Sequence, residues 1–87
     1  MEKKIKFFGV LRKFGDDRGY YITTLLPGMT AEKLKTQLKS ELTQKFPNFD
    51  GALIDESALA SESEVLSKFS VISNDSDIAL LPPVCGG

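Results

Sequence analysis

Alternation of polar and apolar residues identifies the start of the chain as a β-strand. In KKIKFFGVL, residues 3–11, Ile5 and Phe7 alternate with lysines. A period of two predicts a strand with one buried face. On this alternation Phe8 points outward with the lysines, which is unusual for a large aromatic side chain.

A second run of β-forming residues predicts a hairpin. YYITTLLP, residues 20–27, is aromatic and β-branched, which is typical of a strand. The charged connection over 12–19 contains Gly15 and Gly19 and leaves room for one short helical turn. The two strands are therefore expected to pair antiparallel.

Residues 27–47 carry the pattern of an amphipathic helix. Thr30 is a suitable N-cap, and the carboxylate of Glu32 is favoured in the first turn. Pro47 ends the helix because it cannot continue the hydrogen-bond pattern. Apolar residues recur every four positions and predict one buried stripe, made of Leu34, Leu38, Leu42 and Phe46.

The second half of the chain has shorter signals. Residues 48–56 are expected to form a loop with a short apolar piece, and 57–72 one or two short strands. The sequence SNDSD at 73–77 has the composition of a turn. The apolar run at 78–84 predicts a last strand that its prolines end.

The order of these elements predicts a two-layer α+β domain. One amphipathic helix must bury its stripe against a sheet, here a mixed sheet of four to five strands. With the first and last strands as parallel neighbours at its centre, the fold would be a β-grasp. We expect this domain to span residues 1–81 and a flexible tail to span 82–87.

Composition narrows the function. The 87 residues suit one domain, and a net charge of −1 argues against nucleic-acid binding. No apolar run could cross a membrane, and no secretion signal is present, so a cytoplasmic location is expected. The halves differ in charge: residues 1–46 sum to +5 and residues 47–87 to −6. A solvated surface explains this, and the alternative is an acidic face that docks on a basic partner.

Residue types that carry catalysis are scarce. The chain has no histidine and a single cysteine, Cys85. A Ser-His or Cys-His pair is therefore impossible, and no metal site is expected. The protein is not expected to be an enzyme on its own.

The ending LLPPVCGG, residues 80–87, is the strongest chemical signal. Pro82 and Pro83 favour a stiff, extended root. Gly86 and Gly87 could enter a channel too narrow for side chains. An unhindered carboxylate at Gly87 could be activated with ATP to an acyl-adenylate and converted by a sulfur nucleophile to a thiocarboxylate.

Three segments resemble the MoaD/ThiS sulfur-carrier group of ubiquitin-like proteins: IKFFGVLRKFGDD, MTAEKLKTQL and SNDSDIALLPPVCGG. The match is weakest over 48–64. The Pro-Pro-Val-x-Gly-Gly ending favours the small subunit of molybdopterin synthase over the thiamine carrier. Leu80 and Leu81 depart from the usual aromatic pair, and Cys85 stands where small residues are usual.

The resemblance implies a ubiquitin-like β-grasp and a mechanism. An E1-like enzyme would use ATP to adenylate Gly87, and a sulfur-transfer protein would help to make the thiocarboxylate. The tail would then donate sulfur to cyclic pyranopterin monophosphate, building the dithiolene of the molybdenum cofactor. The expected partner is the large synthase subunit, in a heterotetramer, with no bound cofactor on this chain.

The resemblance also implies the surface that partners hold. An apolar patch of Phe8, Val65 and Leu81 would lie beside the tail root, with Arg12 as a polar contact. Each apolar member could instead belong to the core. The tail residues expected to touch partners are Pro82, Pro83, Val84, Cys85 and Gly86.

Other functions stay open at this point. The same fold could carry sulfur for thiamine, cysteine or tRNA thiolation. It could be a ubiquitin-like modifier joined to target lysines through Gly87, or a plain binding module whose tail is irrelevant. Cys85 is either a tolerated small residue, or its thiol attacks the activated Gly87 carbonyl or forms a mixed disulfide with a partner.

Overall fold

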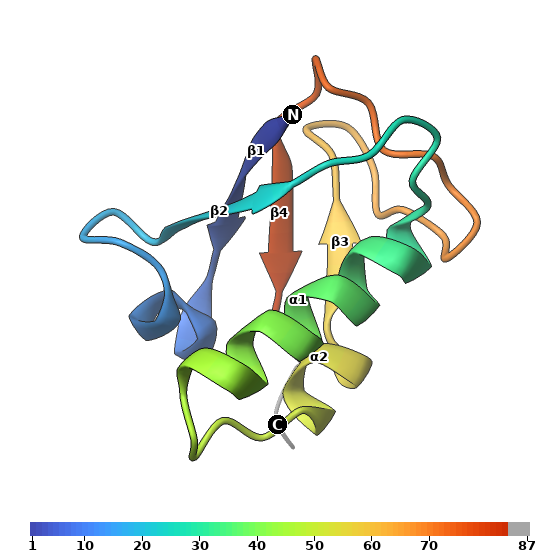
Figure 1. The fold of residues 1–87 in the computed structure, drawn as a ribbon. Coiled ribbons are helices and arrows are strands. Elements are labelled where there is room, and N and C mark those ends of the chain that lie inside the picture. Colours follow the sequence, from blue (N-terminus) through green and yellow to red (C-terminus); the bar gives the residue numbers. More distant parts are fainter. Residues whose placement is uncertain (84–87) are drawn as a thin grey trace.

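The computed structural model describes residues 1–83, in which one mixed sheet carries two helices (Figure 1). The strand order is β2-β1-β4-β3. The strands are β1 (Glu2–Phe7), β2 (Tyr20–Thr24), β3 (Ala58–Ala60) and β4 (Ile78–Leu81). The predicted mixed sheet on one main helix is thereby confirmed.

The first and last strands form the parallel centre of the sheet, as predicted. Ile5 pairs with Ile78 and Phe7 with Leu80. The predicted hairpin is also present, because β1 pairs antiparallel with β2. Both central strands therefore run toward the same end of the molecule, where the described chain reaches Pro83 (Figure 1).

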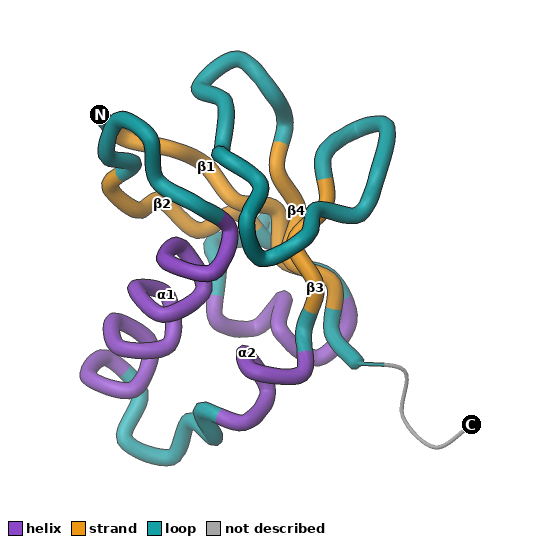
Figure 2. Tube along the Cα trace, turned by 90° about the vertical axis from the view of Figure 1, so that its right-hand side faces the viewer, coloured by secondary structure: helices purple, strands orange, loops and turns teal. Residues whose placement is uncertain are grey.

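The main helix, α1 (Ala31–Lys45), packs across one face of the sheet (Figures 1 and 2). Its first turn is capped by the Thr30 hydroxyl, which accepts a hydrogen bond from the Lys33 amide at 3.3 Å. Phe46 ends the helix and is only partly buried, with its ring edge-on to Phe14. The other three members of the predicted stripe are fully buried: Leu34, Leu38 and Leu42.

The first strand is shorter than predicted. It stops at Phe7, and a 3₁₀-helix, η1 (Gly9–Phe14), follows where the strand was expected to continue. Gly9 has φ of +59°, which turns the chain out of the extended conformation. The short helical turn expected within 12–19 is therefore present, but it begins earlier.

The segment predicted as a loop at 48–56 contains a second short helix, α2 (Ala52–Glu56). The Asp50 carboxylate accepts a hydrogen bond from the Ala52 amide at 3.0 Å, which satisfies a free donor in the first turn. Ile54 anchors the helix because its side chain is fully buried.

The remaining predictions hold with shorter boundaries. β3 and a bridge between Ala60 and Val65 stand where one or two short strands were expected. The last strand ends at Leu81, three residues earlier than predicted, because Pro82 has no amide hydrogen for a further ladder bond.

The core lies between the sheet and the helices. Side chains alternate along the central strands, so that Ile5, Phe7, Ile78 and Leu80 point inward. Among residues 1–83, no helix covers the opposite face of the sheet (Figure 2). The fully buried large side chains are Phe7, Ile5, Leu11, Leu34, Leu38, Leu42, Ile54, Leu59 and Leu80.

Candidate functional site

The two central strands end at the same level, which brings Phe8 beside the root of the tail. The Phe8 amide donates to the Leu80 carbonyl at 3.3 Å, one step past the last paired residues. Leu81, Pro82 and Pro83 follow and are each half-buried. The predicted root residues and Phe8 are therefore neighbours in space, although they lie more than seventy positions apart in the sequence.

Two of the predicted patch residues are largely exposed. Phe8 is 42% exposed and Val65 is 64% exposed, so the alternative of core packing does not apply to either. Leu81 lies opposite Ala58 of β3, and Val65 is bridged to Ala60 of the same strand. Phe8 and Leu81 therefore lie at the end of β4, whereas Val65 lies across β3 at the level of Ala79, nearer the start of β4 and away from the tail root, beside which the patch was predicted.

A shallow cleft of about 500 Å³ lies on the open face of the sheet beside Phe8. Basic residues of the β1–β2 hairpin line one part of it, and acidic residues line another. Lys6 Nζ lies 4.5 Å from the Tyr20 ring centroid and donates to the Arg18 carbonyl at 2.7 Å. The charged residues that line the cleft are Lys4, Lys6, Arg18, Glu62 and Asp77.

Arg12 lies exposed on η1, and a glycine makes room for its side chain. A Cβ at Gly19 would stand 2.9 Å from Arg12 Cγ, so the aliphatic stem crosses the bare backbone there. Gly19 has φ of +84°, and its carbonyl accepts from the Phe7 amide at 2.7 Å. The strand that ends just before Phe8 and the helix that carries Arg12 are therefore fixed against the same residue.

Asp16 closes the connection between η1 and β2. Its Oδ1 accepts hydrogen bonds from the amides of Tyr20 at 2.9 Å and Arg18 at 2.8 Å. These two hydrogen bonds hold the pKa of the Asp16 carboxyl below its usual value, with smaller help from nearby basic residues. The Asp16 amide in turn donates to the Tyr20 carbonyl at 2.7 Å.

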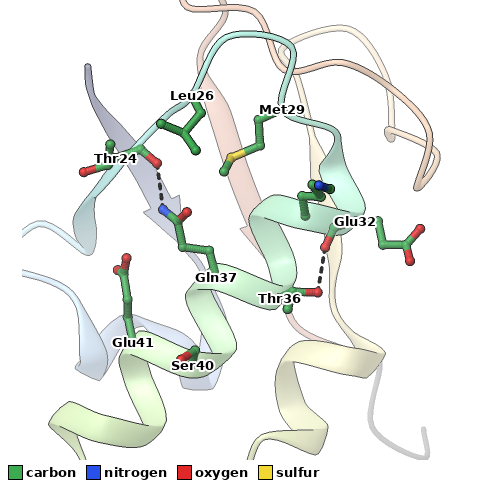
Figure 3. A pocket seen from close by; sticks show the side chains of 9 residues that line it. Thr24, Leu26, Met29, Glu32, Thr36, Gln37, Ser40 and Glu41 are labelled. Carbon is green, nitrogen blue, oxygen red and sulfur yellow. Dashed lines mark hydrogen bonds between the residues drawn. The ribbon is translucent and has the colours of Figure 1, made fainter.

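A separate groove of about 760 Å³ lies on the α1 side of the molecule (Figure 3). It runs between the end of β2 and the helix, and Gln37 crosses it to reach the Thr24 carbonyl at 2.7 Å. Beside it the Glu41 carboxylate accepts from the Tyr21 hydroxyl at 2.8 Å. Burial raises the pKa of the Tyr21 phenol far above its usual value, and this hydrogen bond raises it further. These contacts join β2 to α1.

The rest of the predicted site is the tail. The tail positions Val84, Cys85, Gly86 and Gly87 lie outside the described residues. Among residues 1–83, no group of three His, Cys, Asp or Glu side chains is placed to hold a metal ion. Over the same residues, no helix has the length and apolar character needed to cross a membrane.

Sequence reasoning missed several residues of this region. The sequence did not predict that the cleft is lined by Tyr20, Arg18 and Glu62. It also did not predict the close approach of Arg12 to Gly19. The outward lysines of β1 were the available signal for the cleft, because residues that alternate with a buried face share the open one. Nothing in the sequence alone pairs Gly19 with Arg12.

Solved structures match this fold, and the following two are among those that cover the whole chain. SAMP1 from Haloferax volcanii has a TM-score of 0.66 at 20% identity, with 100% of both chains covered. A complex of subunits 1 and 2 of molybdopterin-converting factor from Helicobacter pylori 26695 gives a TM-score of 0.57 at 20% identity, again with 100% of both chains covered. The sequence matches no family model. No curated protein matches it either.

Proposed function

Because the chain has the ubiquitin-like β-grasp fold of the MoaD/ThiS type, we propose that it is a sulfur carrier and the small subunit of a molybdopterin synthase. An E1-like enzyme adenylates the Gly87 carboxylate with ATP and releases pyrophosphate. A sulfur nucleophile displaces AMP and leaves a thiocarboxylate. This terminal sulfur then attacks cyclic pyranopterin monophosphate, and water cleaves the acyl–sulfur bond, which leaves the sulfur on the pterin and restores the Gly87 carboxylate. Two such transfers supply the two sulfurs of the dithiolene.

One observation carries the proposal: the exposed ring of Phe8 lies beside the end of β4, from which the Pro-Pro-Val-Cys-Gly-Gly sequence follows. Phe8 has no need to be apolar for the core, since 42% of it is exposed. A surface of this kind beside a stiff root suits a partner that must hold the body while it acts on the terminus.

The partners follow from the same chemistry. The chain offers no histidine and no base-nucleophile pair, so the activation and transfer steps are assigned to other proteins. The neighbour from Helicobacter pylori is a complex of two subunits of molybdopterin-converting factor, which supports a large-subunit partner for this chain. An E1-like enzyme and a sulfur-transfer protein complete the cycle.

The test is an intact-mass measurement after incubation with ATP, an E1-like enzyme and sulfide. We expect a mass increase that matches replacement of one oxygen by sulfur. The increase should be absent without ATP and absent in a variant that lacks Gly87. No increase with an enzyme that charges its own carrier would contradict the proposal. Added large subunit and cyclic pyranopterin monophosphate should then discharge the sulfur. Discharge to thiamine, cysteine or tRNA precursors instead would assign the other pathways.

A protein modifier is the second candidate. SAMP1, a ubiquitin-like small archaeal modifier, has the higher TM-score of the two structures reported above. Both functions need an activated Gly87, so charging alone does not separate them. A denaturing gel of cell extract does: a ladder of heavier conjugates that depends on Gly87 indicates a modifier, and a single free band indicates a carrier.

A further inference from the structure

Gly9 faces the first proline of the tail root at close range. A Cβ added at Gly9 would lie 2.7 Å from Cγ of Pro82, closer than real Cβ contacts come. The two residues are next to each other because the parallel pairing of Phe7 with Leu80 continues by one bond, from the Phe8 amide to the Leu80 carbonyl. The chain leaves the sheet at Gly9 on one strand and at Pro82 on the other.

The backbone conformation of Gly9 is not the only reason why a side chain is excluded at this position. Its φ of +59° favours glycine, but Gly28 has φ of +74° and nothing within 4 Å of its added Cβ. A side chain at Gly28 would meet only backbone strain, whereas one at Gly9 would also displace the Pro82 ring. The two glycines therefore form a matched pair that differs in the tail contact.

The Pro82 ring depends on packing for its position. Proline has no amide hydrogen, so no ladder bond from Pro82 can hold the chain at this level. The ring instead occupies the space that a Cβ at position 9 would need. A residue with a side chain at position 9 would push the ring away from η1.

We propose that Gly9 is a positioning residue for the tail: its missing side chain seats Pro82 and sets the direction in which the chain leaves the sheet. This inference rests on the proposed function for its biological meaning. Because Pro82 and Pro83 form a stiff root, its direction sets where the chain begins its path toward a partner. A misplacement of about 1 Å at a reacting group is enough to slow a reaction.

The direct test uses the single cysteine as a reporter. A nitroxide attached to Cys85 broadens the amide signals of those body residues that the tail approaches. We expect Gly9→Ala to change the pattern of broadened amides and Gly28→Ala to reproduce the wild-type pattern. Pro82→Ala removes the ring atoms that the new Cβ would meet. Adding Gly9→Ala to that background should therefore cause no further change.

A kinetic test connects the geometry to charging by the E1-like enzyme. Gly9→Ala leaves the exposed ring of Phe8 in place, so we expect kcat to fall about tenfold with little change in KM. Gly28→Ala, with a similar backbone strain, should stay close to the wild type in both constants. A merely structural effect would lower the activity of both variants in proportion to their unfolded fraction.

The outcomes separate the two ideas. If Gly9→Ala and Gly28→Ala give the same broadening pattern as the wild type, the inference is wrong. If Gly9→Ala alone changes the pattern while the wild type is never charged, the seating of the tail stands and the proposed function fails. If Gly9→Ala does not fold, Pro82→Ala removes the same contact from the tail side, and an unchanged pattern in that variant overturns the inference.

Discussion

Phe8 and Phe69 are exposed phenylalanines with similar neighbours and different places in the fold. Phe8 is 42% exposed beside the tail root, and Phe69 is 71% exposed in the loop before β4. A lysine lies over each ring, at 5.9 Å for Lys6 over Phe8 and 5.0 Å for Lys68 over Phe69. Any difference between them in partner binding therefore reports position and not residue type.

We expect Phe8→Ala to weaken binding to the E1-like enzyme and to the large subunit about thirtyfold, because a central aromatic anchor contributes about 2 kcal/mol to an interface. Phe69→Ala should change each dissociation constant less than twofold. Isothermal titration calorimetry measures both. Equal losses from the two substitutions would show that Phe8 is not part of the docking surface.

Asp16 gives a pH-dependent prediction at the same scale. Its two backbone hydrogen bonds lower its pKa in the folded state below the value of 3.8 for a free side chain. Its charge therefore stabilises the fold above that pH, and the contribution disappears as the pH falls through the lowered pKa.

Replacing Asp16 by Asn keeps an acceptor oxygen and removes the charge. We expect urea unfolding to show a lower free energy of unfolding for Asp16→Asn at neutral pH. The difference from the wild type should shrink as the pH falls from 3.8 through the lower folded-state pKa. A difference that is constant with pH would contradict the role of the carboxylate.

Single residues also show where sequence reasoning stops. The outward direction of Phe8 was predictable because alternation is a local property of a strand. The burial of Lys3 was not, since its ammonium donates to the carbonyls of Asn74 and Ser76. These partners lie about seventy positions along the chain, and nothing in their side chains announces a backbone contact.

At the scale of elements, polar side chains fix β2 against α1. The Thr23 hydroxyl donates to the Glu41 carboxylate at 3.0 Å and accepts from Gln37 Nε2 at 2.7 Å. Tyr21 joins the same carboxylate while its ring stacks on Phe7 at 5.3 Å. The phenol therefore contributes both to the core and to the connection between sheet and helix.

Tyr21→Phe separates these two contributions because it keeps the ring and removes the hydroxyl. We expect the free energy of unfolding to fall by about 1 to 2 kcal/mol, as for loss of a partly buried hydrogen bond to a charged group. Tyr20→Phe, on the open face, is the matched control and should stay within about 0.5 kcal/mol of the wild type. Urea denaturation at neutral pH measures both. Equal effects would show that the Glu41 contact adds nothing.

Elements differed in how well the sequence predicted them. α1 was clear because it has a capping residue at its start and an apolar stripe that repeats over its fifteen residues. α2 has only five residues, too few to show a helical period, and its single anchor Ile54 reads equally well as part of a loop. The strand boundaries failed at Gly9 and Pro82, where a positive φ and a missing amide act locally.

For the whole molecule, the two sequence halves of opposite charge meet on the open face of the sheet. Lys4, Lys6 and Arg18 line one part of the cleft beside Phe8, and Glu62 and Asp77 line the other. In this cleft, the acidic residues of the second half therefore form only one side of a mixed surface. The sequence shows that the basic residues are concentrated in the first half of the chain and the acidic residues in the second. Only the parallel pairing of β1 with β4 shows that the two groups lie side by side.

This arrangement leads to a prediction about how the protein is passed between partners. Phe8 and the tail root lie together at one end of the sheet, and under the proposed function the chain must present both to whichever protein acts on Gly87. The E1-like enzyme and the large subunit should therefore compete for one surface.

Added large subunit should slow charging by raising the apparent KM while kcat is unchanged, with an inhibition constant equal to its own dissociation constant. Large subunit mixed with Phe8→Ala should inhibit more weakly by the same factor as its binding is weakened. A ternary complex that survives gel filtration would mean that the two partners hold different faces of the carrier.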